Sequence, residues 1–155
     1  MNIPTSDKKI ASEFDKTGSP VTVFLASTIG ESPVLPIFLR EYANLIDAGY
    51  AQYSMVGNNR NKSVYAVMDN KIVAIMVYEI GEDITKTTWL NFSFVDEKFR
   101  GRGIFKILHK CLEDCVKTAG SKKISSLIHI DNTTMLASAK SVGRLPVFYR
   151  TEKRI

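Results

Sequence analysis

The segment FVDEKFRGRGIFKIL, residues 94–108, constrains the fold of this chain more than any other. It begins in an apolar run, passes two glycines that each follow an arginine, and continues with apolar residues at helical spacing. A helix N-terminus exposes unpaired backbone N–H groups and carries partial positive charge. Gly101 and Gly103 let the backbone approach a ligand, and Arg100 and Arg102 add forked donors. The sequence therefore predicts a strand–turn–helix unit that binds phosphate oxygens.

The rest of the pattern predicts an α/β domain with a mixed, mostly antiparallel sheet flanked by helices. The three middle strands are joined by turns too short for a parallel crossover, so they must be antiparallel. In the third of them, Leu90, Phe92 and Phe94 are expected to share one face. We expect strands at residues 21–27, in both halves of 63–80, and at 84–95, 123–130 and 145–152, and helices at 33–48, 104–119 and 133–142.

Length and hydropathy predict one domain of ordinary size. We expect residues 1–20 to form a polar tail and residues 21–155 to form the domain. No apolar run approaches the roughly 20 residues of a membrane helix, and the N-terminus has no hydrophobic signal core. These features predict a cytoplasmic protein without membrane contact. Cys111 and Cys115 are expected to be small buried side chains, and no metal site is predicted.

The formal net charge of +5 is compatible with nucleic acid, a membrane surface or an anionic small ligand. The basic residues gather around the glycine turn and at the C-terminus, which suits a local phosphate site. Nucleic acid is unlikely as a partner, because no stacking aromatic residues interleave with the basic ones. A P-loop is excluded, because no Lys-Ser or Lys-Thr follows the glycines. A dinucleotide motif is weak, since Lys106 stands where its third glycine should be.

Three parts of the sequence together resemble the GNAT superfamily of N-acetyltransferases, which bind acetyl-CoA. The family pattern Arg/Gln-x-x-Gly-x-Gly/Ala follows a strand and a short acidic turn, as it does here at residues 95–105. The family's next strand ends in Asp-Asn, followed by a helix and a glycine, as at residues 131–143. The hairpin YAVMDNKIVAIMV is similar to the family's second and third strands. The resemblance extends over about residues 21–152.

The resemblance implies a binding site for acetyl-CoA as the co-substrate. The backbone of Phe94 and Val95 would pair with the pantetheine, and the Val95 N–H would donate to the thioester carbonyl oxygen. Asn132 would hydrogen-bond the pantetheine arm, and Ser138 and Lys140 would contact the far end of the cofactor. The backbone amides that would hold the pyrophosphate are those of Arg100, Gly101, Arg102, Gly103, Ile104, Phe105 and Lys106.

The sequence departs from the family pattern at several positions. Phe105 stands where the family prefers Gly or Ala, and Arg144 stands where an aromatic residue is common. Ala139 replaces a tyrosine that in many members protonates the departing thiolate. These departures keep open an alternative, a non-catalytic member that binds CoA or a protein partner. The short C-terminal strand also leaves open a sheet edge that a second subunit would complete, as a homodimer.

The main hypothesis is direct acetyl transfer to a primary amine of an unidentified acceptor, either a small molecule or a peptide or protein. His129 is the preferred titratable catalytic candidate, because it lies three residues before Asn132 and histidine titrates near neutral pH. A hydrogen-bonded core histidine on the strand 123–130 is the other interpretation of this residue. His109 is expected on the polar, solvated side of its helix.

Overall fold

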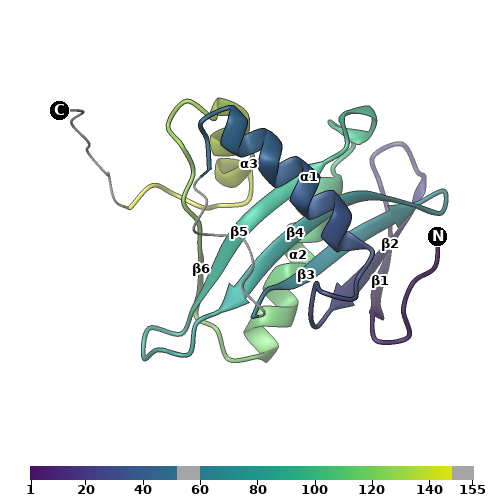
Figure 1. Cartoon of the computed structure of the whole chain (residues 1–155), viewed down its shortest axis with the longest axis horizontal. Coiled ribbons are helices and arrows are strands. Elements are labelled where there is room, and N and C mark those ends of the chain that lie inside the picture. The colour runs from purple at the N-terminus through teal and green to yellow at the C-terminus, as the bar shows by residue number, and fades with distance from the viewer. Residues whose placement is uncertain (52–59, 148–155) are drawn as a thin grey trace.

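A computed structural model describes residues 1–51 and 60–147 of the 155-residue chain. In this part of the chain one sheet has the strand order β1-β2-β3-β4-β5-β6 (Figure 1). Neighbouring strands are antiparallel, except that β5 and β6 are parallel. The predicted mixed, mostly antiparallel sheet is therefore confirmed. The strands are β1 Lys8–Phe14, β2 Pro20–Ala26, β3 Lys62–Met68, β4 Lys71–Ile80, β5 Thr87–Val95 and β6 Lys123–Ser125.

The sheet separates two hydrophobic layers, each covered by one long helix. The helices are α1 Val34–Asp47, α2 Ile104–Thr118 and α3 Thr133–Ser141, and a short 3-10 helix, η2 Glu97–Phe99, precedes α2. Figure 1 shows α1 in front of the sheet and α2 behind it. Phe38 of α1 packs with Tyr65 and Phe92 on one face, and Leu108 of α2 packs with Val64 on the other. The apolar stripe predicted for α2 therefore faces the sheet.

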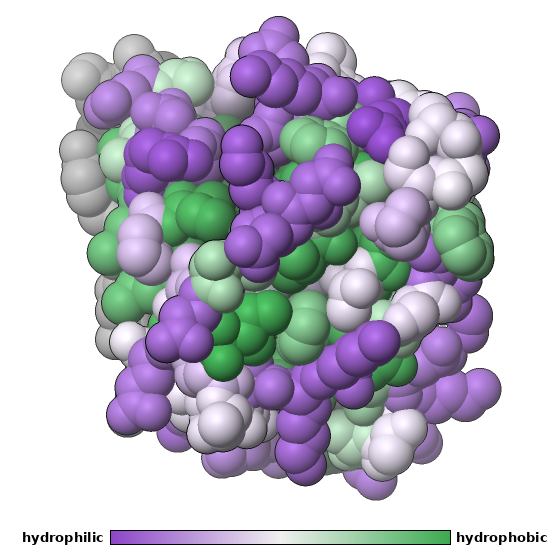
Figure 2. Space-filling view, turned by 90° about the vertical axis from the view of Figure 1, so that its right-hand side faces the viewer, coloured by the Kyte–Doolittle hydropathy of each residue, from purple (hydrophilic) through white to green (hydrophobic). Residues whose placement is uncertain are grey.

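The N-terminal residues correct the prediction of a polar tail at 1–20. Residues 8–14 form the edge strand β1, which pairs antiparallel with β2. This strand reads KKIASEF and is almost wholly exposed, so its side chains give little periodic signal. Its backbone pairing is independent of side-chain polarity, and charged residues are typical of an edge strand. Figure 2 views the molecule from this side and shows polar side chains interleaved with apolar surface.

The predicted alternation along β5 is broken by a bulge. Tyr78 of β4 pairs with Leu90 and Val77 pairs with Phe92, so Asn91 is an extra residue on β5. Leu90 consequently packs in the α2 layer, whereas Phe92 packs in the α1 layer. The prediction that these two residues share a face with Phe94 was wrong for Leu90, because one inserted residue reverses the side-chain alternation.

The C-terminal part of the sheet is shorter than predicted. The strand expected at 123–130 ends at Ser125, after three pairs with β5. Residues 145–147 of the expected strand 145–152 are not in a strand, and residues 148–152 lie outside the described part. No helix among the described residues is long and apolar enough to cross a membrane.

A buried carboxyl group joins the N-terminus to the core. Asp7 accepts hydrogen bonds at Oδ2 from the hydroxyl groups of Ser32 and Tyr65, each at 2.8 Å. All three residues are buried. Burial and the neighbouring Asp7 together raise the pKa of Tyr65, so its hydroxyl keeps the proton that it donates. The hydrogen bonds fix the chain just before β1 to the start of α1 and to β3.

We predict that Tyr65→Phe lowers the free energy of unfolding by about 1–3 kcal/mol, because it deprives a buried carboxyl group of a donor. Tyr78→Phe is the matched control, since Tyr78 is equally buried and its hydroxyl has no hydrogen-bond partner among the described residues. Urea unfolding of both variants measures the difference. Equal losses in the two variants would contradict the role assigned to Asp7.

Candidate active site

The glycine turn ends in an open set of backbone donors at the start of α2. Gly101 and Gly103 have φ angles of 74° and 85°, and Gly103 is the N-cap residue of α2. The first N–H groups of α2 that find an acceptor are those of Lys106 and Ile107, which both donate to Gly103 O. Within the described residues, the N–H groups from Gly101 to Phe105 donate to no protein acceptor.

The space beside the turn is open. A Cβ atom added to Gly101 would meet nothing within 4 Å. Converging unpaired N–H groups at a helix N-terminus suit a phosphate group. The turn therefore fits the diphosphate of an acyl-CoA, which the sequence led us to expect here.

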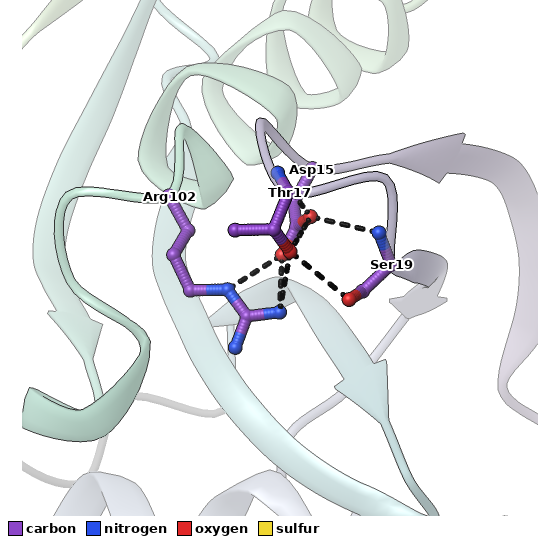
Figure 3. Close-up of polar contacts among 4 residues, drawn as sticks. All are labelled: Asp15, Thr17, Ser19 and Arg102. Carbon is purple, nitrogen blue, oxygen red and sulfur yellow. Dashed lines mark hydrogen bonds and ion pairs between the residues drawn. The ribbon is translucent and has the colours of Figure 1, made fainter.

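The side chain of Arg102 reaches toward the turn between β1 and β2 (Figure 3). Its Nε and Nη2 atoms each lie 2.6 Å from Asp15 Oδ2, and Nη2 also donates to Thr17 Oγ1 at 3.2 Å. The guanidinium also lies over the ring of Phe99, 5.2 Å from its centroid. Arg102 thus binds protein groups with most of its donors. The sequence analysis missed Asp15, because no local pattern links it to a residue 87 positions away.

Asp15 is held ionised by its hydrogen bonds. Burial by itself would raise the pKa of this carboxyl group, whose side chain is fully buried. Donors from Thr17, from the Ser19 backbone and from Arg102 outweigh burial and lower the pKa from 3.8 to about 2. Its Oδ1 atom accepts three of these bonds, from Thr17 N, Thr17 Oγ1 and Ser19 N at 2.7–2.9 Å.

The outer edge of β5 opens where β6 ends. Only residues 87–89 of β5 pair with β6, so the rest of β5 has no neighbour on that side within the described chain. Asp96 N–H donates to Val73 O on β4, so by alternation the backbone groups of Val95 point to the open edge and those of Phe94 point to β4. Of the two residues expected to pair with pantetheine, Val95 is the one with outward backbone groups.

Arg100 already occupies part of this edge. Its Nε donates to Val95 O at 3.0 Å, while the side chain stays exposed. The remaining guanidinium nitrogens have no protein partner among the described residues. Arg100, unlike Arg102, therefore keeps donors available to a ligand that lies between the glycine turn and the edge of β5.

The expected pantetheine ligand Asn132 is the N-cap residue of α3. Its Oδ1 accepts from Met135 N at 3.2 Å, which leaves its Nδ2 group as the donor toward a ligand. Ser138 is half-buried and Lys140 is exposed on α3, and Ala139 is buried between them. These residues share one short helix, and nothing in the described chain joins them to the glycine turn by a hydrogen bond.

His129 is not the core histidine that was considered as one interpretation. Since β6 ends at Ser125, His129 lies in the loop before α3, with 43% of its side chain exposed. Its Nδ1 accepts from Asp131 N–H at 3.2 Å, and its ring lies 5.5 Å from that of Tyr50. With Nδ1 as acceptor, the neutral ring carries its proton on Nε2. That Nε2–H group has no hydrogen-bond partner among the described residues.

His109 is buried, so the expectation of a solvated residue was wrong. It is 2% exposed, its Nδ1 lies 3.0 Å from Glu113 Oε1, and its Nε2 has no partner in the described structure. Burial, and then the charge of Arg144, lower the pKa of His109, and Glu113 opposes them. The helical pattern could not reveal this, because Arg144, whose charge acts on His109, comes 35 positions later in the chain. Arg144 Nη1 donates to Ser126 Oγ at 2.7 Å.

The described chain supports no metal site, and its hollow near the β4–β5 turn is separate from the candidate active site. No group of three or more His, Cys, Asp or Glu residues among the described positions lies close enough to hold a metal ion. A hollow of about 190 Å³ is lined by residues from the β4–β5 turn and from the end of α2, including Gly81 and Gly120. It lies at the opposite end of α2 from the glycine turn and is separate from the site described above.

The fold and the glycine turn together define a domain of the acyl-CoA N-acyltransferase type. Residues 33–143 match the acetyltransferase (GNAT) family. The chain therefore belongs to the GNAT family of acetyltransferases. No curated protein sequence matches the chain.

Solved structures of GNAT enzymes share the fold at low sequence identity. A ribosomal-protein-alanine N-acetyltransferase from Brucella melitensis biovar Abortus 2308 is 16% identical, with a TM-score of 0.65 over 87% of this chain and 99% of that one. An aminoglycoside acetyltransferase from an uncultured soil sample is 16% identical, with a TM-score of 0.59 over 86% and 97%. The aminoglycoside N-acetyltransferase AAC(6')-Iy, solved with CoA, is 20% identical, with a TM-score of 0.52 over 76% and 92%.

We predict that Asp15→Asn destabilises the protein at neutral pH and that this difference disappears in acid. The folded-state pKa of about 2 lies below the usual 3.8, so the ionised carboxylate stabilises the folded state above pH 4. That contribution is lost as the pH falls from about 4 to about 2, because the unfolded chain takes up the proton in this range while the folded protein still resists protonation. Urea unfolding of both proteins between pH 7 and pH 2.5 measures the change.

Asp83→Asn is the control for this experiment. Asp83 accepts the same pair of bonds from Thr85, N–H and Oγ1, in the exposed β4–β5 turn, without an arginine partner among the described residues. We expect Asp83→Asn to lower the free energy of unfolding at neutral pH by less than Asp15→Asn does. A pH-independent difference for Asp15→Asn would show that its carboxylate charge does not stabilise the fold.

Proposed function

We propose that the protein transfers the acetyl group of acetyl-CoA directly to a primary amine. The observation that carries the proposal is the row of unpaired N–H groups from Gly101 to Phe105, next to the open edge of β5. Family membership supports acetyl-CoA as the ligand of this row. Acetyl-CoA supplies a thioester, whose acetyl carbon is open to attack by an amine.

The chemistry requires one bond exchange and one proton transfer. A C–N bond forms, the C–S bond breaks, and the amine nitrogen loses a proton while the thiolate sulfur gains one. We place the Val95 N–H at the thioester carbonyl oxygen, where a backbone donor stabilises developing negative charge. Its outward direction at the unpaired end of β5 supports this placement. Val95 is thus proposed as a donor through its backbone, whatever its side chain.

His129 is proposed as the hydrogen-bond donor to the departing sulfur. The Asp131 N–H donates to His129 Nδ1 at 3.2 Å, which favours the tautomer with the proton on Nε2. A neutral ring in this tautomer donates a hydrogen bond from Nε2 and cannot accept there, so we assign it the stabilisation of the developing thiolate, which takes its proton from solvent. This role would replace that of the family tyrosine, whose position is held by buried Ala139.

The alternative function is CoA binding without catalysis, and Ala139 is the observation that favours it. A second departure from the family pattern, Phe105, does not weigh against CoA binding. Its ring stacks on His109 with centroids 6.1 Å apart and packs at the edge of the α2 layer. The space beside Gly101 remains open despite this bulky residue.

The acceptor is proposed only as a class. The similar enzymes act, by their names, on a ribosomal-protein alanine and on aminoglycosides. Both acceptor kinds present a primary amine, which is ionised at neutral pH and must lose a proton before attack. We therefore propose a primary amine and leave both a small molecule and a protein N-terminus as candidates for the assay below.

We predict that the wild-type protein binds acetyl-CoA and that Gly101→Asp weakens this binding at least about tenfold relative to Gly101→Asn. Both side chains tolerate the positive φ of 74°, and the space around Gly101 is open. The pair therefore differs in charge and hardly in shape. Calorimetric titration at low salt measures both affinities, because salt would screen the repulsion. No binding by the wild type would refute the proposed function, and equal affinities would refute the placement of the diphosphate.

We predict that the protein releases CoA thiol from acetyl-CoA with at least one member of a panel of aminoglycosides, polyamines and peptides with free N-termini. His129→Gln is expected to lower this rate about 100-fold, because it removes the donor to the departing sulfur. The calorimetric affinity for acetyl-CoA should stay unchanged.

Asp131→Ala is the control, since it keeps the backbone N–H that orients His129 and removes an exposed carboxylate. An unaltered rate in His129→Gln would exclude this residue from the mechanism. Binding of acetyl-CoA without thiol release for any amine would favour the non-catalytic alternative.

A further inference from the structure

The turn between β1 and β2, residues 15–19, is attached directly to the glycine turn at the start of α2. Lys16 N–H donates to Arg102 O at 3.0 Å, which adds a backbone bond to the contacts that the Arg102 side chain makes with Asp15 and Thr17. Figure 3 shows Arg102 reaching from one side and the β1–β2 turn from the other. These contacts hold the β1–β2 turn in one position beside the N–H groups of α2.

Lys16 extends from this turn across Gly103. If Gly103 carried a Cβ atom, that atom would lie 3.3 Å from Lys16 Cγ, 3.7 Å from Cδ and 3.4 Å from Cε. The methylene groups of Lys16 therefore follow the surface of the N-cap residue of α2. The ammonium nitrogen is one bond beyond Cε, so it also lies close to Gly103, the N-cap residue of α2. A glycine is needed at 103 both for the positive φ and for this close contact.

The charge of Lys16 has no partner in the described chain. Its side chain is exposed, and it forms no ion pair or hydrogen bond with any described residue. A cation at a helix N-terminus is unfavourable, because the helix end carries partial positive charge. Arg100 adds a second cation with free donors nearby, and the one buried carboxylate at this place, Asp15, is already bound to Arg102. An anion bound between these groups would balance the excess positive charge.

We propose that Lys16 is a further ligand of the diphosphate of acetyl-CoA, and that Arg102 is a positioning residue that holds the Lys16 turn in place. The inference rests on the proposed function and assigns its site a residue from the N-terminal edge of the sheet. Lys16 supplies the charge-assisted hydrogen bond to phosphate oxygen that the sequence pattern assigns to Arg102. Arg102 acts through Asp15, which fixes the turn that carries Lys16.

The test compares Lys16→Met with Lys16→Arg. Methionine keeps the length and apolar character of the stem and removes the charge, whereas arginine keeps the charge. Calorimetric titrations use CoA, 3′-dephospho-CoA and pantetheine as ligands. We expect Lys16→Met to bind CoA and 3′-dephospho-CoA about tenfold more weakly than the wild type and pantetheine equally well. Lys16→Arg should bind all three ligands nearly as the wild type does.

Lys9→Met is the matched control, because Lys9 is an exposed lysine on β1 of the same hairpin, away from the turn. It should leave all three affinities unchanged. An unchanged affinity in Lys16→Met, while the wild type binds CoA, would overturn this inference and leave the proposed function standing. A loss confined to CoA would place Lys16 at the 3′-phosphate and overturn the diphosphate assignment. Weaker binding of pantetheine by Lys16→Met would show that the substitution disturbs the structure of the site.

The positioning role of Arg102 is tested by a double-mutant cycle. If Arg102 acts by placing Lys16, Lys16→Met should weaken CoA binding much less in an Arg102→Met background than in the wild type. Additive losses would show that Arg102 contacts the ligand independently, which would overturn its positioning role. Circular dichroism melting confirms that each variant is folded at the temperature of the titration.

Discussion

The burial of α2 against the sheet decides where the unpaired N–H groups of the site point. Ile104, Leu108 and Leu112 are each at most 1% exposed, and burying such side chains contributes about 1.5–3 kcal/mol each. This packing fixes the axis of α2, and the positive φ of Gly103 lets the chain enter the helix directly from the turn. The first turn of the helix is thereby exposed next to the end of β5. Every other feature of the proposed CoA site is placed relative to these N–H groups.

The geometry of β5 supplies the second half of the site. A single extra residue, Asn91, changes the alternation of the strand, and bulges increase local twist. Beyond Trp89, β5 has no β6 neighbour, so in the described part of the chain backbone groups that a complete sheet would pair are left at an open edge. The proposed pairing of pantetheine with Val95 would satisfy such groups in the same way as a further strand does.

The charges around the site have distinct functions even though several are of the same type. Arg102 is bound to a buried carboxylate and stabilises the junction of two turns, whereas Arg100 and Lys16 keep their charge toward solvent. His109 and Arg144 are different again, because both have nitrogen atoms buried without a hydrogen-bond partner in the described structure. Burial lowers the pKa of both groups. Net charge alone could not separate these roles.

The sequence predicted the site through local chemistry. Short-range patterns predict the glycine turn, the helical stripe of α2 and the N-cap at Asn132. Each depends on residues within about one helical turn of one another, so it can be recognised before the fold is known. Errors arose where distant segments meet. His109 was expected in solvent because the pattern of its own helix does not show its burial or the charge of Arg144, which comes 35 positions later. Residues 1–20 were expected to be a tail because backbone hydrogen bonds hold this edge strand, and its polar side chains give no sequence signal of that pairing.

The sequence by itself determined the strand–turn–helix unit, the mixed sheet and the GNAT family, because periodicity and glycine placement act over short distances along the chain. Only the tertiary structure decided that Arg102 binds Asp15 and that Lys16 lies over Gly103. Those contacts join residues more than eighty positions apart, through a turn whose residues show no pattern of their own. The physical reason is that ion pairs and van der Waals contacts depend on distance in space, which the chain fixes only after the sheet and α2 have packed.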